Sequence, residues 1–180
     1  APANAGTIAA NGVPMTQTVA PPLPSFETRG HHSISGLSSG AFMTVQMSMA
    51  HSARFMGAGI VAGGPYRAAE TFPLAAPTAP MSCILNSLYV AMTPLTEATA
   101  PDVDRLLGLA RETPGIDDLA HVARQRLYIF TGTEDRVVNQ LVVRTTKRFY
   151  EALGVAGAAL RFVEDVPAGD SSVTSNREES

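Results

Sequence analysis

The chain is poor in cysteine, in charge and in long apolar runs, and each shortage excludes a class of protein. Cys83 is the only cysteine among the 180 residues, so no disulfide can form within the chain. Charged residues make up 16%, and the formal net charge is −3 without a basic cluster, so nucleic acid and membrane surfaces are poor partners. No apolar run approaches the roughly 18 residues of a membrane span. A hydrophobic content of 45% therefore points to a globular protein with one core.

The first part of the chain differs from the rest in composition. Residues 1–24 are rich in Ala, Pro, Thr, Gly and Asn, and they lack the basic start and apolar stretch of a signal peptide. We expect a flexible leader there, left after a signal peptide has been removed. Residues 25–180 are expected to form a single domain, because no second boundary is visible.

Short apolar runs alternate with helix-forming segments along that domain. Strands are expected at residues 33–35, within 57–66, at 127–130 and at 160–163, and helices at 41–50, 102–110, 116–122 and 138–153. Residues 67–80 are expected to form a surface loop and residues 81–92 a helix. Strands that alternate with helices predict an α/β fold with a mainly parallel sheet.

The most informative motif is Gly-Leu-Ser-Ser-Gly at residues 36–40. It has the G-x-S-x-G form of a nucleophile elbow, in which a sharp turn between a strand and a helix presents the serine hydroxyl. The expected strand before it and helix after it supply that context. Ser38 is then the candidate nucleophile, and the amide of Ser39 a candidate oxyanion donor at the positive end of the helix. The alternative is an ordinary turn of glycine and serine.

A second candidate follows the clearest strand. Asp135 comes a few residues after residues 127–130, where a parallel sheet places functional groups. It could accept the Nδ1–H of a histidine and stabilise the imidazolium. The residues alone leave two alternatives, a turn-forming or capping aspartate and the neighbouring Glu134 as the acid.

Several of these segments together resemble the polyhydroxybutyrate depolymerase family of esterases. The resemblance runs in order from about residue 33 to residue 174. It rests on six separate segments, at residues 35–43, 57–59, 62–66, 130–138, 153–155 and 166–169.

The resemblance implies a circularly permuted α/β-hydrolase fold, a three-layer sandwich with a mainly parallel sheet. It implies hydrolysis of polyester or oligoester bonds through an acyl-enzyme, without metal or cofactor, in a secreted or periplasmic protein. Ser38 matches the family's nucleophile, Asp135 its triad acid, and Ser39 an oxyanion-hole amide.

The sequence departs from the family pattern in three places. The family has its catalytic histidine directly after a Pro-Ala-Gly segment, and here Asp170 follows residues 167–169. The family also continues well beyond this point, so the chain is interpreted as truncated on the carboxyl side. The missing part would supply further strands of the sheet and a second oxyanion donor. Arg67 stands where the family has a cysteine, so Cys83 would lack the cysteine with which it forms a disulfide in the family.

The chain has four histidines, and none is expected to replace the missing one. They are His31, His32, His51 and His121. The first two precede the nucleophile strand, the third ends the elbow helix, and the fourth precedes the acid strand. Each should therefore lie away from the active edge of the sheet.

Three interpretations follow. The leading one is an ester hydrolase of the depolymerase type, weakly active or inactive because Asp170 replaces histidine; related acyl hydrolases, such as feruloyl esterases or polyamide hydrolases, stay open. The second is a polymer-binding remnant without catalysis, and the third is an unstable fragment with exposed sheet edges.

Overall fold

A computed structural model describes residues 24, 30–71, 92–94 and 96–169. Within them four strands form one sheet in the order β1-β2-β3-β4, and every neighbouring pair is parallel. The strands are β1 (His32–Leu37), β2 (Phe55–Val61), β3 (Arg126–Gly132) and β4 (Leu160–Val166). The predicted parallel α/β sheet is confirmed, with each strand somewhat longer than its apolar run.

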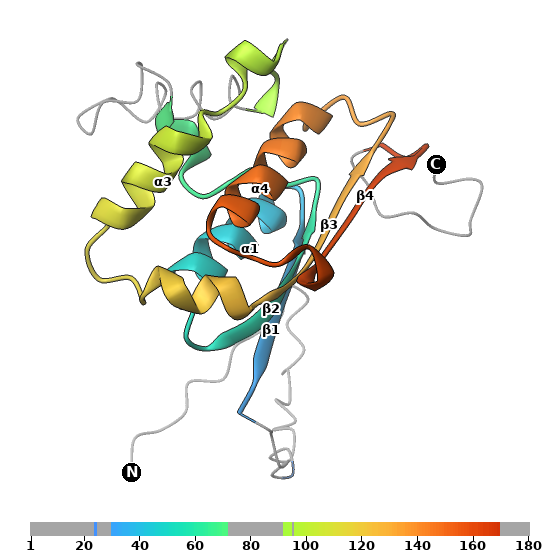
Figure 1. The fold of residues 1–180 in the computed structure, drawn as a ribbon. Helices are drawn as coiled ribbons and strands as arrows, with labels where there is room; N and C mark the ends of the chain where they lie inside the picture. The colour runs from blue at the N-terminus through green and yellow to red at the C-terminus, as the bar shows by residue number, and fades with distance from the viewer. Residues whose placement is uncertain (1–23, 25–29, 72–91, 95, 170–180) are drawn as a thin grey trace, which may run out of the picture.

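In the described part of the chain, three α-helices lie on one side of this sheet, two of them packed directly on it. They are α1 (Ser39–Ala50), α3 (Val103–Glu112) and α4 (Gln140–Ala152), with short 3₁₀ helices at Ala68–Thr71, Glu97–Thr99, Leu119–Arg124 and Gly157–Ala159. Figure 1 shows α1, α3 and α4 on the same side of the strands. Helix α1 packs on β1 and β2, while α4 packs on β3 and also contacts α3.

The core lies between this helical layer and the sheet. Its fully buried side chains include Val45 and Met49 of α1, Ile60 of β2, Ile129 of β3 and Phe149 of α4. Burying a side chain of this size stabilises the fold by roughly 1.5–3 kcal/mol. All four strands run the same way, so their carboxyl ends form one edge of the sheet, where loops can gather functional groups.

Side-chain caps explain where the helices begin. Asn139 caps α4 by accepting the amide hydrogen of Leu141 at 2.9 Å, so the helix starts at Gln140 and not at Val138 as expected. Asp102 caps α3 in the same way through Arg105, which places the proline of residue 101 outside the first turn.

The short helix expected at residues 116–122 is instead a 3₁₀ helix at Leu119–Arg124. Two aspartates account for the shift. Asp117 Oδ2 accepts the amide hydrogen of Ala53 at 3.0 Å, which ties residue 117 to the end of α1. Asp118 Oδ1 accepts the amide hydrogen of Ala120 at 2.9 Å and starts the helix one residue later.

Several expectations concern residues outside those described. They are the leader at residues 1–24 apart from residue 24, the loop beyond residue 71, and most of the helix expected at residues 81–92. In the described part of the chain, no helix is both long enough and apolar enough to span a membrane.

A buried tyrosine gives the fold a pH-dependent contribution. Burial raises the pKa of the Tyr150 phenol from the ordinary 10.0 to about 12, and its hydrogen bond to Ser48, at 3.0 Å between the oxygens, opposes the rise. The neutral phenol is favoured in the folded state, so its contribution is complete below pH 10 and is lost as the pH rises to about 12. A shift of this size corresponds to roughly 3 kcal/mol.

The variant Tyr150→Phe tests this contribution. At pH 8 we expect it to be less stable than the wild type by about 1 kcal/mol, because the Ser48 hydrogen bond is lost. Between pH 10 and 12 the wild type should lose stability that the variant keeps, so the difference should shrink or reverse. Urea unfolding at pH 8, 10 and 11.5 measures both curves; curves that stay parallel would contradict the prediction.

Candidate active site

Ser38 lies at the junction between β1 and α1, at the carboxyl edge of the sheet. Its backbone has φ 53° and ψ −121°, a strained conformation for a residue with a side chain. Three backbone hydrogen bonds hold it there: the Ser38 amide donates to the Val61 carbonyl at 2.9 Å, and the Ser38 carbonyl accepts from the amides of Ala41 and Phe42. The serine is therefore held between the neighbouring strand and the first turn of the helix.

The two glycines of the motif have different roles. A Cβ on Gly36 would lie 2.2 Å from the carbonyl oxygen of Gly40, so only glycine permits this close approach of strand and helix. A Cβ on Gly40 would meet no described atom within 4 Å beyond its chain neighbours and the backbone of its own helix. The close approach of β1 and α1 thus requires glycine at position 36, and the described residues leave room for a side chain at position 40.

Ser39 is the first residue of α1 and is exposed. Amides in the first turn of a helix have no partner within the helix, and the helix dipole places partial positive charge there. The Ser39 amide therefore has the location that a donor to a developing negative charge requires.

Asp135 lies in the loop that follows β3, at the same edge of the sheet. Its Oδ1 accepts two backbone hydrogen bonds, from the amides of Val137 at 2.9 Å and Val138 at 2.8 Å, and its Oδ2 is buried. These bonds fix the direction of the carboxylate. The rival Glu134 is exposed, which makes Asp135 the better candidate for an oriented acid.

The loop of Asp135 is joined to the segment that follows β4. The amide of Thr133 donates to the Val166 carbonyl at 2.9 Å, and the amide of Glu134 donates to the Ala168 carbonyl at 3.1 Å. A Cβ on Gly132 would lie 1.8 Å from the Ala168 oxygen, so the two backbones touch. The segment that leads to Asp170 thus runs beside the acid loop, while Asp170 itself is outside the described residues.

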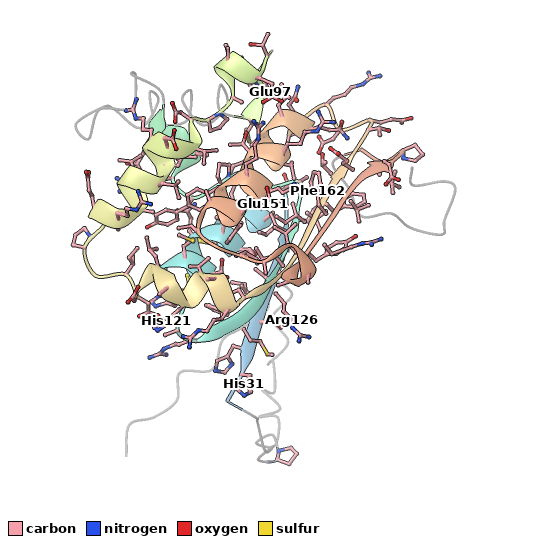
Figure 2. The ribbon with its side chains drawn as sticks, viewed as in Figure 1. His31, Glu97, His121, Arg126, Glu151 and Phe162 are labelled. Carbon is pink, nitrogen blue, oxygen red and sulfur yellow. The ribbon has the colours of Figure 1, made fainter. Side chains whose placement is uncertain are left out.

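The four histidines are distant from Ser38. Figure 2 shows His31 and His121 toward the end of the sheet opposite the strand arrowheads of Figure 1, and His32 is the first residue of β1. Strand rise alone separates His32 from Ser38 by about 20 Å. His51 follows the last residue of α1, which is also about 20 Å from the helix start.

Arg67 replaces the cysteine that the resemblance led us to expect, and it makes contacts of its own. Its guanidinium binds both carboxylate oxygens of Glu70, and donates to the Leu109 carbonyl at 3.2 Å and to Thr113 Oγ1 at 2.8 Å. The hydrogen bonds to Glu70 raise the pKa of Arg67 above its ordinary value. The side chain thus joins the turn after β2 to the end of α3, while Cys83 lies outside the described residues.

Sequence reasoning missed two features of this edge. Ala62, directly after β2, has φ 52°, and its amide donates to the Phe130 carbonyl at 2.9 Å. Gln140 donates from Nε2 to the carbonyls of Gly132 and Glu164, each at 3.0 Å. Neither feature has a sequence signal. Alanine has no preference for positive φ, and a glutamine at the start of a helix does not indicate that its side chain binds a loop.

Among the described residues, no group of three or more His, Cys, Asp or Glu side chains is placed to hold a metal ion. The groups gathered at the carboxyl edge are instead a hydroxyl, helix-start amides and a carboxylate. Such a set suits acyl transfer, provided that a base is supplied nearby.

Comparison with solved structures defines the class of fold. A polyhydroxybutyrate depolymerase from Penicillium funiculosum matches with a TM-score of 0.64 at 24% identity, over 83% of this chain and 42% of that one. A depolymerase complexed with an R3HB trimer matches with the same TM-score of 0.64 at 23% identity and the same coverage, 83% and 42%. The fold is α/β-hydrolase-like, as predicted. Circular permutation stays a prediction, because it concerns strands beyond these four.

Comparison of sequences gives the relatives. No family model matches the chain. It is 32% identical over 142 residues to a poly(3-hydroxybutyrate) depolymerase of Delftia acidovorans, and 29% identical over 133 residues to a polyhydroxybutyrate depolymerase of Talaromyces funiculosus. The chain is thus related to the polyhydroxybutyrate depolymerases, which confirms the resemblance. The alignments cover 78% and 73% of this chain but only 26% and 34% of the two relatives.

Proposed function

We propose that this chain is a serine ester hydrolase of the polyhydroxybutyrate depolymerase type, with Ser38 as the nucleophile. The observation that carries the proposal is the strained backbone of Ser38, φ 53°, between a parallel strand and a helix start. Strain of this kind persists only where the surrounding structure enforces it, and it gathers at functional sites. Here it presents one hydroxyl beside the Ser39 amide, a candidate oxyanion donor.

The reaction would proceed through an acyl-enzyme. Ser38 Oγ attacks the carbonyl carbon of the ester, and its proton passes to a base. The negative charge that develops on the carbonyl oxygen faces the Ser39 amide and the start of α1. The alcohol leaves with a proton, and water then cleaves the acyl–serine bond to release the acid and restore the hydroxyl.

The identity of the base sets the rate in this proposal. Asp135 matches the acid that would orient a histidine and stabilise its cation. The resemblance puts that histidine at the position of Asp170. A carboxylate with an ordinary pKa of about 3.9 is a weak base for a serine hydroxyl, and it would repel Asp135. We therefore propose low activity for this chain.

The proposed substrate is a polyester or oligoester of short hydroxy acids. The support is the names of the relatives, and the R3HB trimer in the complex of the depolymerase with the same fold. A secreted or periplasmic location is proposed on the same relation.

Labelling with a fluorescent phosphonate that attacks activated serines tests the proposal. We expect slow labelling of the wild type and none of Ser38→Ala. The matched control is Ser39→Ala, which removes the adjacent exposed hydroxyl and keeps the amide, and it should label like the wild type. Labelling that persists in Ser38→Ala would show that Ser38 is not the nucleophile.

A second candidate function is binding of the polymer without hydrolysis. The placement of the four histidines favours it, since none is positioned as a base for Ser38. His31 and His121 lie toward the opposite end of the sheet (Figure 2), and His32 and His51 lie at the far ends of β1 and α1. Sedimentation with polyester granules, by a folded chain that releases no soluble acid, would support this function over the first.

A further inference from the structure

We propose that Gln140 is a positioning residue that holds the loop of Asp135 against the segment following β4. This inference rests on the proposed function for its catalytic meaning, while the contacts themselves are properties of the fold. Gln140 is the first residue of α4, and its side-chain amide donates both of its hydrogens to backbone carbonyls.

The first of these bonds closes the acid loop. Gln140 Nε2 lies 3.0 Å from the carbonyl oxygen of Gly132, the last residue of β3. Asp135 sits between these two residues, and its carboxylate is already bound to the amides of Val137 and Val138. The side chain of Gln140 thus joins the end of the loop to its beginning, and Asp135 lies in the loop that this hydrogen bond closes.

The second bond joins this loop to β4 at an irregularity in the sheet. Phe130 pairs with Val163, but Gly132 pairs with Val166, so β4 has one extra residue between the two pairs. A bulge of this kind disrupts the ladder and leaves backbone groups without their regular partners. Gln140 Nε2 donates to one of these groups, the Glu164 carbonyl, at 3.0 Å. A single carboxamide therefore joins β3 to β4 across the bulge.

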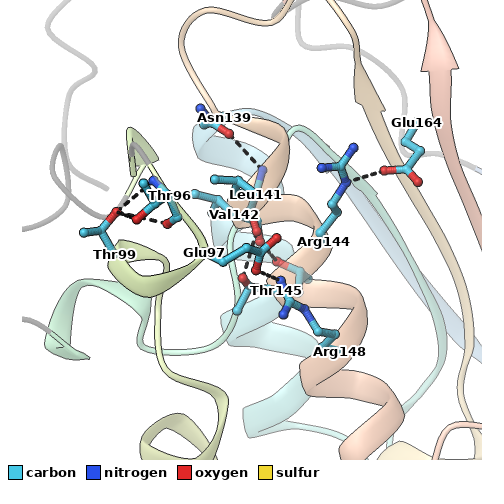
Figure 3. A network of polar contacts seen from close by, with 11 residues as sticks. Thr96, Glu97, Thr99, Asn139, Leu141, Val142, Arg144, Thr145, Arg148 and Glu164 are labelled. Atoms are coloured by element: carbon cyan, nitrogen blue, oxygen red, sulfur yellow. Dashed lines mark hydrogen bonds and ion pairs between the residues drawn. The ribbon is translucent and has the colours of Figure 1, made fainter.

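A neighbouring ion pair orients that carboxamide. Arg144, one turn further along α4, forms a 2.6 Å contact with Glu164 Oε2, and Figure 3 shows it reaching from the helix to the strand. The same guanidinium lies 3.4 Å from Gln140 Oε1. A cation beside Oε1 directs Nε2 of Gln140 toward the two carbonyls.

The bonds beyond the bulge are the ones that matter for the site. Thr133 donates to Val166 and Glu134 donates to Ala168, and these contacts align the acid loop with residues 166–169. Those residues lead directly to Asp170, where the resemblance puts the base. Gln140 therefore fixes the acid loop against residues 166–169, the described segment that precedes position 170.

Hydrogen exchange of the folded chain tests the contacts without reference to activity. The variant Gln140→Met has a similar length and no donors. We expect the amides of Thr133 and Glu134 to exchange at least about tenfold faster, since two hydrogen bonds are lost, while those of Ile129 in the middle of β3 change little. Lys147→Met, on the same helix, is the matched control and should leave all three amides unchanged. Unchanged exchange in Gln140→Met overturns the inference.

Kinetics then separate a positioning role from a structural one. In a chain that carries Asp170→His, Gln140→Met should lower kcat about tenfold or more with little change in KM, because the substrate still binds and the acid and base are misaligned. An unchanged kcat would overturn the positioning role. If the Asp170→His chain itself shows no turnover that depends on Ser38, the proposed function fails, and the exchange result alone decides whether Gln140 holds the loop.

Discussion

The variant Asp170→His is expected to hydrolyse a soluble short-chain ester about 10²–10⁴ times faster than the wild type. A positioned general base contributes a factor of this size, and a histidine near its ordinary pKa is half-neutral close to neutral pH. Two residues before position 170, the Ala168 carbonyl accepts the amide hydrogen of Glu134, next to Asp135. Initial rates with a p-nitrophenyl ester, measured from pH 5 to 9, are the appropriate test.

The pH profile separates a catalytic histidine from a change in charge. Activity of Asp170→His should rise as the imidazole loses its proton and level off above it, since only the neutral form accepts the proton of Ser38. Asp170→Asn removes the same negative charge without adding a base and should stay at the wild-type rate. The gain should vanish when Ser38→Ala is combined with Asp170→His. No gain in the histidine variant, or an equal gain in the asparagine variant, would contradict the assignment of Asp170 to the position of the base.

The pattern of the sequence predicted the order and type of the described strands because each has a local signal. Residues 127–130 are all large apolar or aromatic side chains, which favour a strand. The motif at residues 36–40 indicates a turn that leads into a helix. The parallel arrangement followed from the alternation of strands and helices. The ends of the helices and the 3₁₀ helix at Leu119–Arg124 were predicted less well. Their positions depend on which of several neighbouring side chains caps the helix, and this shifts the helix end by one or two residues.

In the candidate site, too, local features could be predicted from the sequence and contacts between distant residues could not. Ser38 and Asp135 could be proposed from motifs, since strand–turn–helix and the loop after a strand are local features. The closure of the acid loop by Gln140 could not, because its partners Gly132 and Glu164 lie 8 and 24 residues away along the chain. The positive φ of Ala62 is likewise set by contact with β3 and not by its own preference. Long-range contacts of this kind become visible only in the folded chain.

The variant Gly36→Ala should damage the fold and the site together. The added methyl group would lie 2.2 Å from the carbonyl oxygen and 2.3 Å from the carbonyl carbon of Gly40, and 2.8 Å from the amide nitrogen of Ala41. These are backbone atoms of the first helical turn, which cannot rotate aside as a side chain would. Relief requires β1 and α1 to separate, and that movement removes the support for the strained backbone of Ser38. We expect a loss of about 1–3 kcal/mol or more in the free energy of unfolding, measured by urea denaturation.

Gly40→Ala is the matched control for Gly36→Ala, because it adds the same methyl group to the other glycine of the same motif. Apart from its chain neighbours and the backbone of its own helix, no described atom lies within 4 Å of that Cβ position, and Gly40 lies within α1. Alanine also restricts the unfolded chain more than glycine does, so we expect a stability equal to the wild type or higher by about 0.4–1 kcal/mol. Phosphonate labelling of Ser38 should be lost in Gly36→Ala and retained in Gly40→Ala. Equal effects of the two substitutions would show that the close contact between β1 and α1 does not hold Ser38 in place, since only Gly36 lies within it.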